Sequence, residues 1–299
     1  QSSPNEAGIS TSKHGFTLTH RMHQANKRRR IRRTHGPQPG PRRSLLVACC
    51  ACFAAMLPAC SPLTPASGAA GTPVGPGAVL AVGGGGTPMA VAQRGLRETR
   101  TAGAGPRVAV VPFASAREDR GLSSVEMWRT AGAASAVLVP EDERARALIE
   151  GADLIWLGGG SQLRLMESLE RLDLVELIRA RHRAGAVVGG TSAGAAVLGS
   201  VMISGAPEPE AYASGAMPAL ASLQLVPGVI VDQHFRERKR EGRLISALLD
   251  RQADGPDGWV GVGISEATAA IFVDGTFEVM GEGVVRVFDT RQATITAAV

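Results

Sequence analysis

One pentapeptide combines the residue types of a serine nucleophile with the spacing that would expose it. Gly190-Thr191-Ser192-Ala193-Gly194 fits the pattern Gly-x-Ser-x-Gly and directly follows an apolar stretch. Small residues on both sides of the serine let a strand turn sharply into a helix, which holds the hydroxyl above the edge of a sheet and aims helix amides at a developing negative charge. The pattern predicts Ser192 as a nucleophile, and a tight packing turn is the alternative.

A serine nucleophile needs a base, and the chain beyond its N-terminal segment contains two histidines. His182 lies in the charged end of a helical pattern, RARHR, where we expect a solvated surface position. His234 follows an apolar run, residues 229–231, and two polar residues, so we expect it at the carboxyl end of a strand. The sequence therefore predicts His234 as the general base, with a structural histidine as the alternative.

The third member of such a relay is a carboxylate that orients the imidazole. Asp232 lies only two residues before His234, which makes direct pairing awkward. Glu266 follows another strand pattern, residues 260–264, and should reach the same edge of the sheet. We therefore predict Glu266 for this role, and an exposed acid in a turn is the alternative.

An oxyanion hole needs two amides that point at one spot. Ala193 follows the serine and can supply one of them. Gly159 and Gly160, in a glycine run at another predicted strand end, can supply the second without an obstructing side chain. A phosphate-binding loop is the alternative, but neither this run nor residues 83–86 has the Lys-Ser/Thr of a P-loop or fits Gly-x-Gly-x-x-Gly with a suitable downstream acid.

Short apolar runs that end in glycine or proline recur along the chain, as expected for strands that are buried on both faces. The runs are residues 78–82, 108–111, 154–157 and 186–188. Helical patterns lie between them, the clearest over residues 163–183. This alternation predicts an α/β fold with a mainly parallel sheet flanked by helices, in a single domain over residues 78–299. Three later runs, residues 269–273, 277–280 and 284–288, predict β-hairpin strands at the C-terminal end.

The composition excludes a disordered chain, because 44% of the 299 residues are hydrophobic and 20% are charged. Residues 1–59 hold ten of the 32 Lys and Arg and one of the 27 Asp and Glu, so the rest of the chain carries a net charge of −4. The high pI is therefore no sign of nucleic-acid binding. All four cysteines lie in residues 49–60, so the following domain has neither disulfides nor a cysteine metal site.

The N-terminal part has the features of an export signal. We expect residues 1–43 to be a basic segment that is disordered or lies upstream of the true start. Residues 44–60 read as a signal peptide whose apolar run is too short to span a bilayer. This segment ends in Leu-Pro-Ala-Cys, which resembles a lipobox with Cys60 as the lipidated residue. We expect residues 61–77 to be a flexible linker and the domain to be exported to the periplasm or cell envelope as a lipoprotein, with plain secretion as the alternative.

Four blocks of the sequence resemble, in order, the cyanophycinase family of serine peptidases, whose relatives include the aspartyl dipeptidases. The blocks are WLGGGSQ from Trp156, GTSAGA from Gly190, DQHF from Asp232 with the arginines after it, and GVGISEATA from Gly261. The resemblance covers nearly the whole domain. It implies a fold like that of flavodoxin and the class I amidotransferases, and hydrolysis of cyanophycin, a poly-aspartate that carries arginine on its side chains, into β-aspartyl-arginine.

Carried over residue by residue, the resemblance implies Ser192 as nucleophile, His234 as base and Glu266 as its orienting acid. It also implies a set of residues in or beside the substrate pocket: Gln162, Asp232, Gln233, Arg238, Arg240 and Arg243. No metal or cofactor is required, the partner is a peptide or cyanophycin, and a homodimer is left open. Ser161 and Ser265 depart from the family pattern, in which acids are common, so an aspartyl dipeptidase-like exopeptidase and an inactive binding domain are alternative functions.

Overall fold

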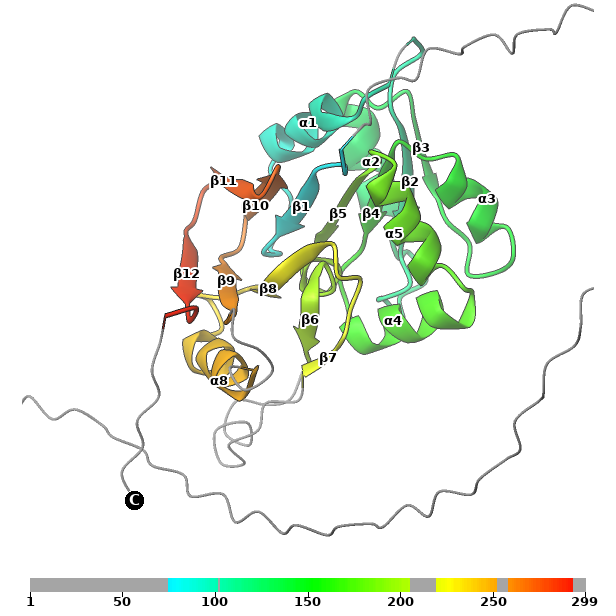
Figure 1. The fold of residues 1–299 in the computed structure, drawn as a ribbon. Coiled ribbons are helices and arrows are strands. Elements are labelled where there is room, and N and C mark those ends of the chain that lie inside the picture. The colour runs from blue at the N-terminus through cyan, green and yellow to red at the C-terminus, as the bar shows by residue number, and fades with distance from the viewer. Residues whose placement is uncertain (1–74, 102, 205–218, 252–257, 293–299) are drawn as a thin grey trace, which may run out of the picture. The chain divides into compact units, whose positions relative to one another are not determined.

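The computed structural model describes residues 75–101, 103–204, 219–251 and 258–292 (Figure 1). The predicted signal peptide, Cys60 and most of the predicted linker lie outside these residues. No helix within the described ranges has both the length and the apolar character needed to cross a membrane. The described residues all belong to one compact unit.

Seven strands form the first sheet. They are β1 Val79–Val82, β2 Arg107–Val111, β3 Ser135–Leu138, β4 Leu154–Leu157, β5 Val187–Thr191, β10 Thr268–Val273 and β11 Thr276–Gly281. Their order is β11-β10-β1-β5-β4-β2-β3. The five strands from β1 to β3 in this order are parallel, and β10 and β11 are antiparallel at one edge. The predicted mainly parallel sheet is therefore confirmed.

Five shorter strands form a second sheet, which the sequence did not separate from the first. They are β6 Gly199–Ile203, β7 Ala219–Ala221, β8 Val226–Asp232, β9 Val260–Ile264 and β12 Val285–Asp289, in the order β12-β9-β8-β6-β7. The central strands β6, β8 and β9 are parallel, so their carboxyl ends lie at a common edge. This edge carries the polar residues that follow β8 and β9.

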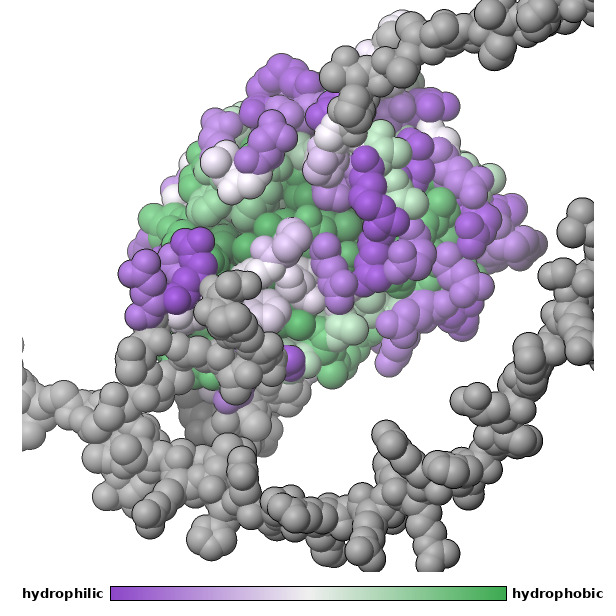
Figure 2. Space-filling model, viewed as in Figure 1, coloured by the Kyte–Doolittle hydropathy of each residue, from purple (hydrophilic) through white to green (hydrophobic). Residues whose placement is uncertain are grey.

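Seven helices flank the sheets in the described part of the chain. They are α1 Met89–Glu98, α2 Leu122–Ala131, α3 Ala145–Glu150, α4 Gln162–Arg171, α5 Val175–Arg183, α6 Ala193–Ala196 and α8 Glu241–Arg251. Buried side chains of α1 and α2 pack on one face of the first sheet, and those of α3 to α6 and of the second sheet pack on the other face. Helix α8 covers the far side of the second sheet. In Figure 2 hydrophilic side chains gather over α1 and over α3 to α5, and hydrophobic ones are visible between these groups.

The single helix predicted over residues 163–183 is wrong, because two helices occupy this segment. Helix α4 ends at Arg171 and α5 begins at Val175. Between them Asp173 has a φ of 52°, in the left-handed region, which breaks the helical hydrogen-bond series. The apolar spacing continues across the break because Leu172, Val175 and Ile178 still face the same core.

The C-terminal hairpin is partly as predicted. Strands β10 and β11 pair antiparallel through a tight turn at Asp274-Gly275. Strand β12 does not extend this hairpin and instead pairs with β9 in the second sheet. Local sequence signals identify a strand and a turn, but they do not specify which sheet accepts the third strand.

Candidate active site

Ser192 lies at the sharp turn between β5 and α6. Its φ of 53° is rare for a residue with a side chain, and its amide donates to the carbonyl of Val82 at 3.0 Å. The flanking glycines are required by space: a Cβ on Gly190 would lie 2.4 Å from the backbone of Gly194, and a Cβ on Gly194 would lie 2.1 Å from the carbonyl oxygen of Leu157. The Gly-x-Ser-x-Gly spacing thus follows from close backbone packing around the serine.

The structure brings the three residues of the predicted relay together. Ser192 Oγ lies 2.8 Å from Nε2 of His234, and Nδ1 of the same ring lies 2.5 Å from Oε1 of Glu266. A carboxylate accepts from Nδ1–H, so the neutral ring presents an unprotonated Nε2 to the serine hydroxyl. The imidazole side chain is 10% exposed and the glutamate side chain is 39% exposed. This arrangement can remove a proton from Ser192.

The environment of His234 favours its neutral, basic form. Burial lowers the pKa of the imidazole below its usual value, and the positive charges of Arg238 and Arg240 lower it further, whereas the hydrogen bond and charge of Glu266 raise it. Burial is the largest of these influences, and the net pKa is lowered. This lowered pKa favours the unprotonated ring that a general base needs.

Two loops place backbone amides beside the nucleophile. Ala193 is the first residue of α6, where helix amides have no partner within the helix. A Cβ on Gly159 would lie 3.3 Å from Cβ of Ser192, so the glycine loop after β4 passes directly against the serine. In this loop Gly158 and Ser161 donate their amides to Val111 and Ala114, which leaves those of Gly159 and Gly160 for an oxyanion.

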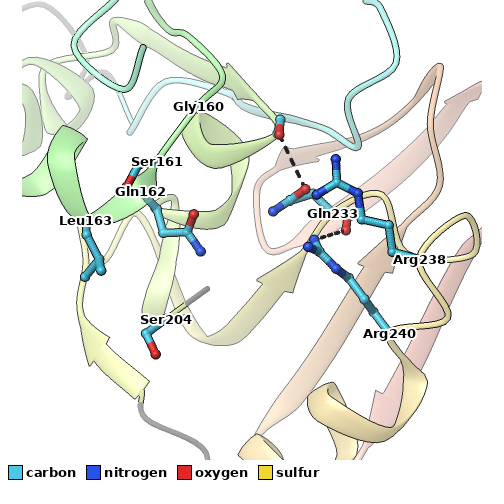
Figure 3. A pocket seen from close by; sticks show the side chains of 9 residues that line it. Gly160, Ser161, Gln162, Leu163, Ser204, Gln233, Arg238 and Arg240 are labelled. Atoms are coloured by element: carbon cyan, nitrogen blue, oxygen red, sulfur yellow. Dashed lines mark hydrogen bonds between the residues drawn. The ribbon is translucent and has the colours of Figure 1, made fainter. Parts of the chain in front are cut away.

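A cavity of about 670 Å³ opens beside the nucleophile. Its lining comprises Gly160, Ser161, Gln162, Leu163, Ser192, Ser204, Gln233, Arg238 and Arg240 (Figure 3). Gln162 is held by a hydrogen bond from its Nε2 to the carbonyl of Ile203 at 2.8 Å, and Gln233 Oε1 lies 3.4 Å from Ser192 Oγ. The wall thus offers amide groups and two guanidinium groups to a substrate.

The two arginines of the wall differ in how they are held. Arg240 donates to the carbonyl oxygen of Gln233 at 2.7 Å and lies 3.5 Å from a carboxylate oxygen of Asp232, so it also braces the residue before the base. Arg238 has no hydrogen bond or ion pair to its side chain within the described residues. Figure 3 shows both side chains next to Gln233, which makes this side of the cavity cationic. Such a wall suits a substrate that carries carboxylates.

Asp232 and Arg243, which the sequence places in or beside the substrate pocket, pair with each other in the structure. The carboxylate of Asp232 forms a two-pronged ion pair with the guanidinium of Arg243, in which Nε lies 2.7 Å from Oδ2. The two residues are 1% and 3% exposed, and neither lines the cavity. Since Oδ1 also accepts the amide of Gln233 at 2.8 Å, the pair supports the segment that carries the base. Asp232 is therefore already occupied and does not offer its carboxylate to a substrate guanidinium.

The expected surface position of His182 is also wrong. The ring is 7% exposed, Nε2 lies 2.8 Å from the carbonyl oxygen of Gly77, and burial lowers the pKa of the imidazole. This histidine anchors the chain just before β1. The position of His182 near the end of α5 did not indicate that the residues just before β1 cover its ring.

Sequence reasoning missed one acidic contact at the site. Oε2 of Glu237 accepts the backbone amide of Glu266 at 3.1 Å and thereby ties the loop after β9 to the loop after β8. Glu237 stands in a run of charged residues, which is typical of a solvated surface, so the sequence carried no distinguishing signal.

Comparison with known proteins places the chain in a family. The sequence profile of peptidase family S51 matches residues 79–280, which include every residue of the relay. The chain belongs to peptidase family S51. The cyanophycinase of Trichormus variabilis is 43% identical over 158 residues, which are 52% of this chain and 51% of that protein. Peptidase E of Actinobacillus pleuropneumoniae is 33% identical over 140 residues, which are 46% of this chain and 58% of that protein.

The chain spans about half the length of the curated relatives that it matches. A solved structure with the same fold is that of a peptidase from an acI-B1 Actinobacterium, with a TM-score of 0.56 and 21% identity. The match covers 71% of this chain and 90% of the other. It confirms the predicted α/β architecture of this family S51 member.

Proposed function

We propose that this family S51 protein is a serine peptidase that works through an acyl-enzyme. The observation that carries the proposal is the continuous hydrogen-bonded series from Ser192 through His234 to Glu266, at 2.8 and 2.5 Å, beside a cavity of about 670 Å³. Membership in a peptidase family supports the same reaction class.

In the proposed reaction Nε2 of His234 takes the hydroxyl proton as Oγ of Ser192 attacks the scissile carbonyl carbon. The carbonyl oxygen becomes an oxyanion, which accepts hydrogen bonds from the amide of Ala193 and from the loop at Gly159. Collapse of this intermediate breaks the C–N bond, and the imidazolium returns its proton to the leaving amine. Water then attacks the acyl-enzyme with the same histidine as base, which releases the acid and restores the serine.

We propose cyanophycin as the substrate, with β-aspartyl-arginine as the product. Each arginine of this polymer is joined through its amino group to an aspartate side chain and so keeps a free carboxylate. The guanidinium of Arg238 and the amide of Gln233 on the cavity wall can bind such a carboxylate. The similarity to cyanophycinases supports this assignment over other peptides.

An aspartyl dipeptidase activity is the second candidate, because the cationic wall at Arg238 and Arg240 would also accept the side chain of an N-terminal aspartate. The similarity to Peptidase E supports it. The two activities differ in what the protein cleaves: a polymer backbone in one case and a short Asp-X peptide in the other.

The decisive experiment is product identification after incubation with purified cyanophycin and, separately, with Asp-X dipeptides. Release of β-aspartyl-arginine from the polymer supports the first candidate, and cleavage of the dipeptides alone supports the second. The variant Ser192→Ala should lose about 10⁶-fold in kcat. Ser135→Ala, at an exposed serine that begins β3, is the matched control and should keep full activity.

An inactive binding protein is the alternative to both activities. Failure of wild-type Ser192 to react with a fluorophosphonate, together with no cleavage of either substrate, would contradict the peptidase proposal. Labelling that disappears in Ser192→Ala and persists in Ser135→Ala would support it.

We also propose that the domain is exported and anchored by a lipid on Cys60. The support is the sequence pattern at residues 44–60. Expression of the full chain in a bacterial host with labelled palmitate should yield a labelled envelope protein. Cys60→Ser should remove the label, and an unlabelled wild-type protein would contradict the anchor.

A further inference from the structure

The last residue of β1 and the two glycines after it form backbone hydrogen bonds at, or next to, all three members of the relay. The carbonyl oxygens of residues 82–84, which are consecutive, each accept one amide from a different active-site loop. The bonds run from Ser192 N to Val82 O at 3.0 Å, from His234 N to Gly83 O at 2.7 Å and from Ala267 N to Gly84 O at 2.8 Å. One short segment therefore sets the mutual positions of three loops that are distant in sequence.

The three residues that donate these amides share an unusual backbone conformation. Ser192, His234 and Ala267 have φ angles of 53°, 46° and 48°. Residues with a Cβ adopt this left-handed region at a cost, and they keep it only where surrounding contacts hold them there. The hydrogen bonds to residues 82–84 are such contacts. The end of β1 thus fixes the backbone of the nucleophile, of the base and of the residue after the acid.

The side chains of the relay also occupy the space above this segment. A Cβ on Gly84 would lie 2.3 Å from Cε1 and 2.4 Å from Nε2 of His234. A Cβ on Gly85 would lie 2.6 Å from both Cβ and Oε2 of Glu266. The imidazole and the carboxylate therefore rest directly on glycine backbone, and any side chain there would displace them.

We infer that Gly84 and Gly85 are positioning residues for the reaction: they hold the base and its carboxylate in register with the nucleophile. This inference rests on the proposed function of Ser192, His234 and Glu266. It gives two glycines of the run at residues 83–86 a specific role, because the imidazole rests on Gly84 and the carboxylate rests on Gly85.

Three alanine variants test the inference. Gly84→Ala and Gly85→Ala introduce the overlaps described above. Gly86→Ala is the matched control, since Gly86 also has a positive φ, 105° against 96° and 66°, but a Cβ there would have no atom within 4 Å. Backbone strain is therefore common to the three variants, whereas displacement of the relay occurs in two of them.

The assay is the rate of covalent labelling by a fluorophosphonate, followed as a function of pH and combined with thermal unfolding. Gly84→Ala and Gly85→Ala should slow labelling on the order of 100-fold, the loss that accompanies a displacement of about 1 Å. They should also shift the acid limb of the pH profile, because the contact of His234 with Glu266 changes. Gly86→Ala should keep the wild-type profile and, within tenfold, the wild-type rate.

A second measurement keeps the inference testable if Gly84→Ala does not fold. Glu266 is partly exposed, so its side chain can move into solvent in Gly85→Ala without unfolding the protein. Gly85→Ala should then add no further loss in a Glu266→Gly background, because both the Cβ and the carboxylate that it displaces are already absent. Additive losses would overturn the inference, as would equal labelling rates and pH profiles in all three glycine variants.

The labelling assay separates this inference from the proposed substrate. It requires a reactive serine and its base but no particular peptide, so a wrong substrate assignment leaves it intact. Wild-type protein that does not react at Ser192 would overturn the proposed function and, with it, the positioning role. Reactive wild-type protein with three equivalent glycine variants would overturn the positioning role alone.

Discussion

The buried ion pair between Asp232 and Arg243 can be tested by removing its cation with Arg243→Met. In the native protein both side chains are almost fully shielded from water, and Arg243 supplies two hydrogen bonds to the carboxylate. After the substitution the carboxylate retains Arg240, whose Nη1 lies 3.5 Å from Oδ1, and the amide of Gln233. The buried negative charge is therefore partly and not fully compensated.

Breaking a buried ion pair on one side costs about 3–5 kcal/mol, because the remaining charge stays desolvated. The residual contact with Arg240 places the expected loss at the lower end, about 3 kcal/mol of unfolding free energy. For a domain of this size that corresponds to a decrease of about 6–12 °C in Tm. The activity should fall as well, since the carboxylate of Asp232 positions the segment that carries His234.

Thermal unfolding followed by circular dichroism measures this loss. Arg236→Met removes an exposed arginine from the same charged run and is the matched control, with an expected change in Tm within about 2 °C. The double variant Asp232→Leu with Arg243→Met should recover part of the lost stability, because it leaves no unpaired carboxylate. An unchanged Tm in Arg243→Met, together with a raised KM, would refute the structural role and favour a contact of Arg243 with substrate.

Further variants address the relay itself. Because burial lowers the pKa of His234 below its usual 6.5, kcat/KM should stay level from pH 8 down to that value and fall only at lower pH, which a pH-rate profile would show. Arg238→Gln removes a positive charge that lowers this pKa, so the acid limb should move to higher pH; an unmoved limb would contradict the electrostatic assignment. Glu266→Gln should reduce kcat by about 10²- to 10⁴-fold with little change in KM, and an unchanged kcat would remove this residue from the relay. Unfolding free energy should also decrease as the pH falls below 6.5, because the unfolded state binds the protons that buried His234 and His182 resist; stability that rises on acidification would contradict this.

The sequence predicted the catalytic edge because polar residues follow its buried strands. Ser192, His234 and Glu266 each stand just after an apolar run, and carboxyl ends of parallel strands meet at one edge. Reasoning from the position of a residue relative to a strand end fails when the hydrogen-bond partner of that residue comes from another part of the chain. His182 has the sequence surroundings of a solvated residue, yet the segment at Gly77 covers it. The sequence places Asp232 in or beside the substrate pocket, but it does not indicate that the guanidinium of Arg243, eleven positions later, pairs with this carboxylate.

The sequence by itself determined the alternation of strands and helices, the tight turn at Ser192 and the candidates for base and acid, because these depend on local periodicity, steric size and position relative to a strand end. Only the tertiary structure decided that β8 and β9 lie in a second sheet, that Arg243 is buried with Asp232, and that the glycines after β1 support the relay. Those features depend on which distant segments meet at one place. Local preferences do not encode that information, since it arises from burying the whole set of apolar faces at once.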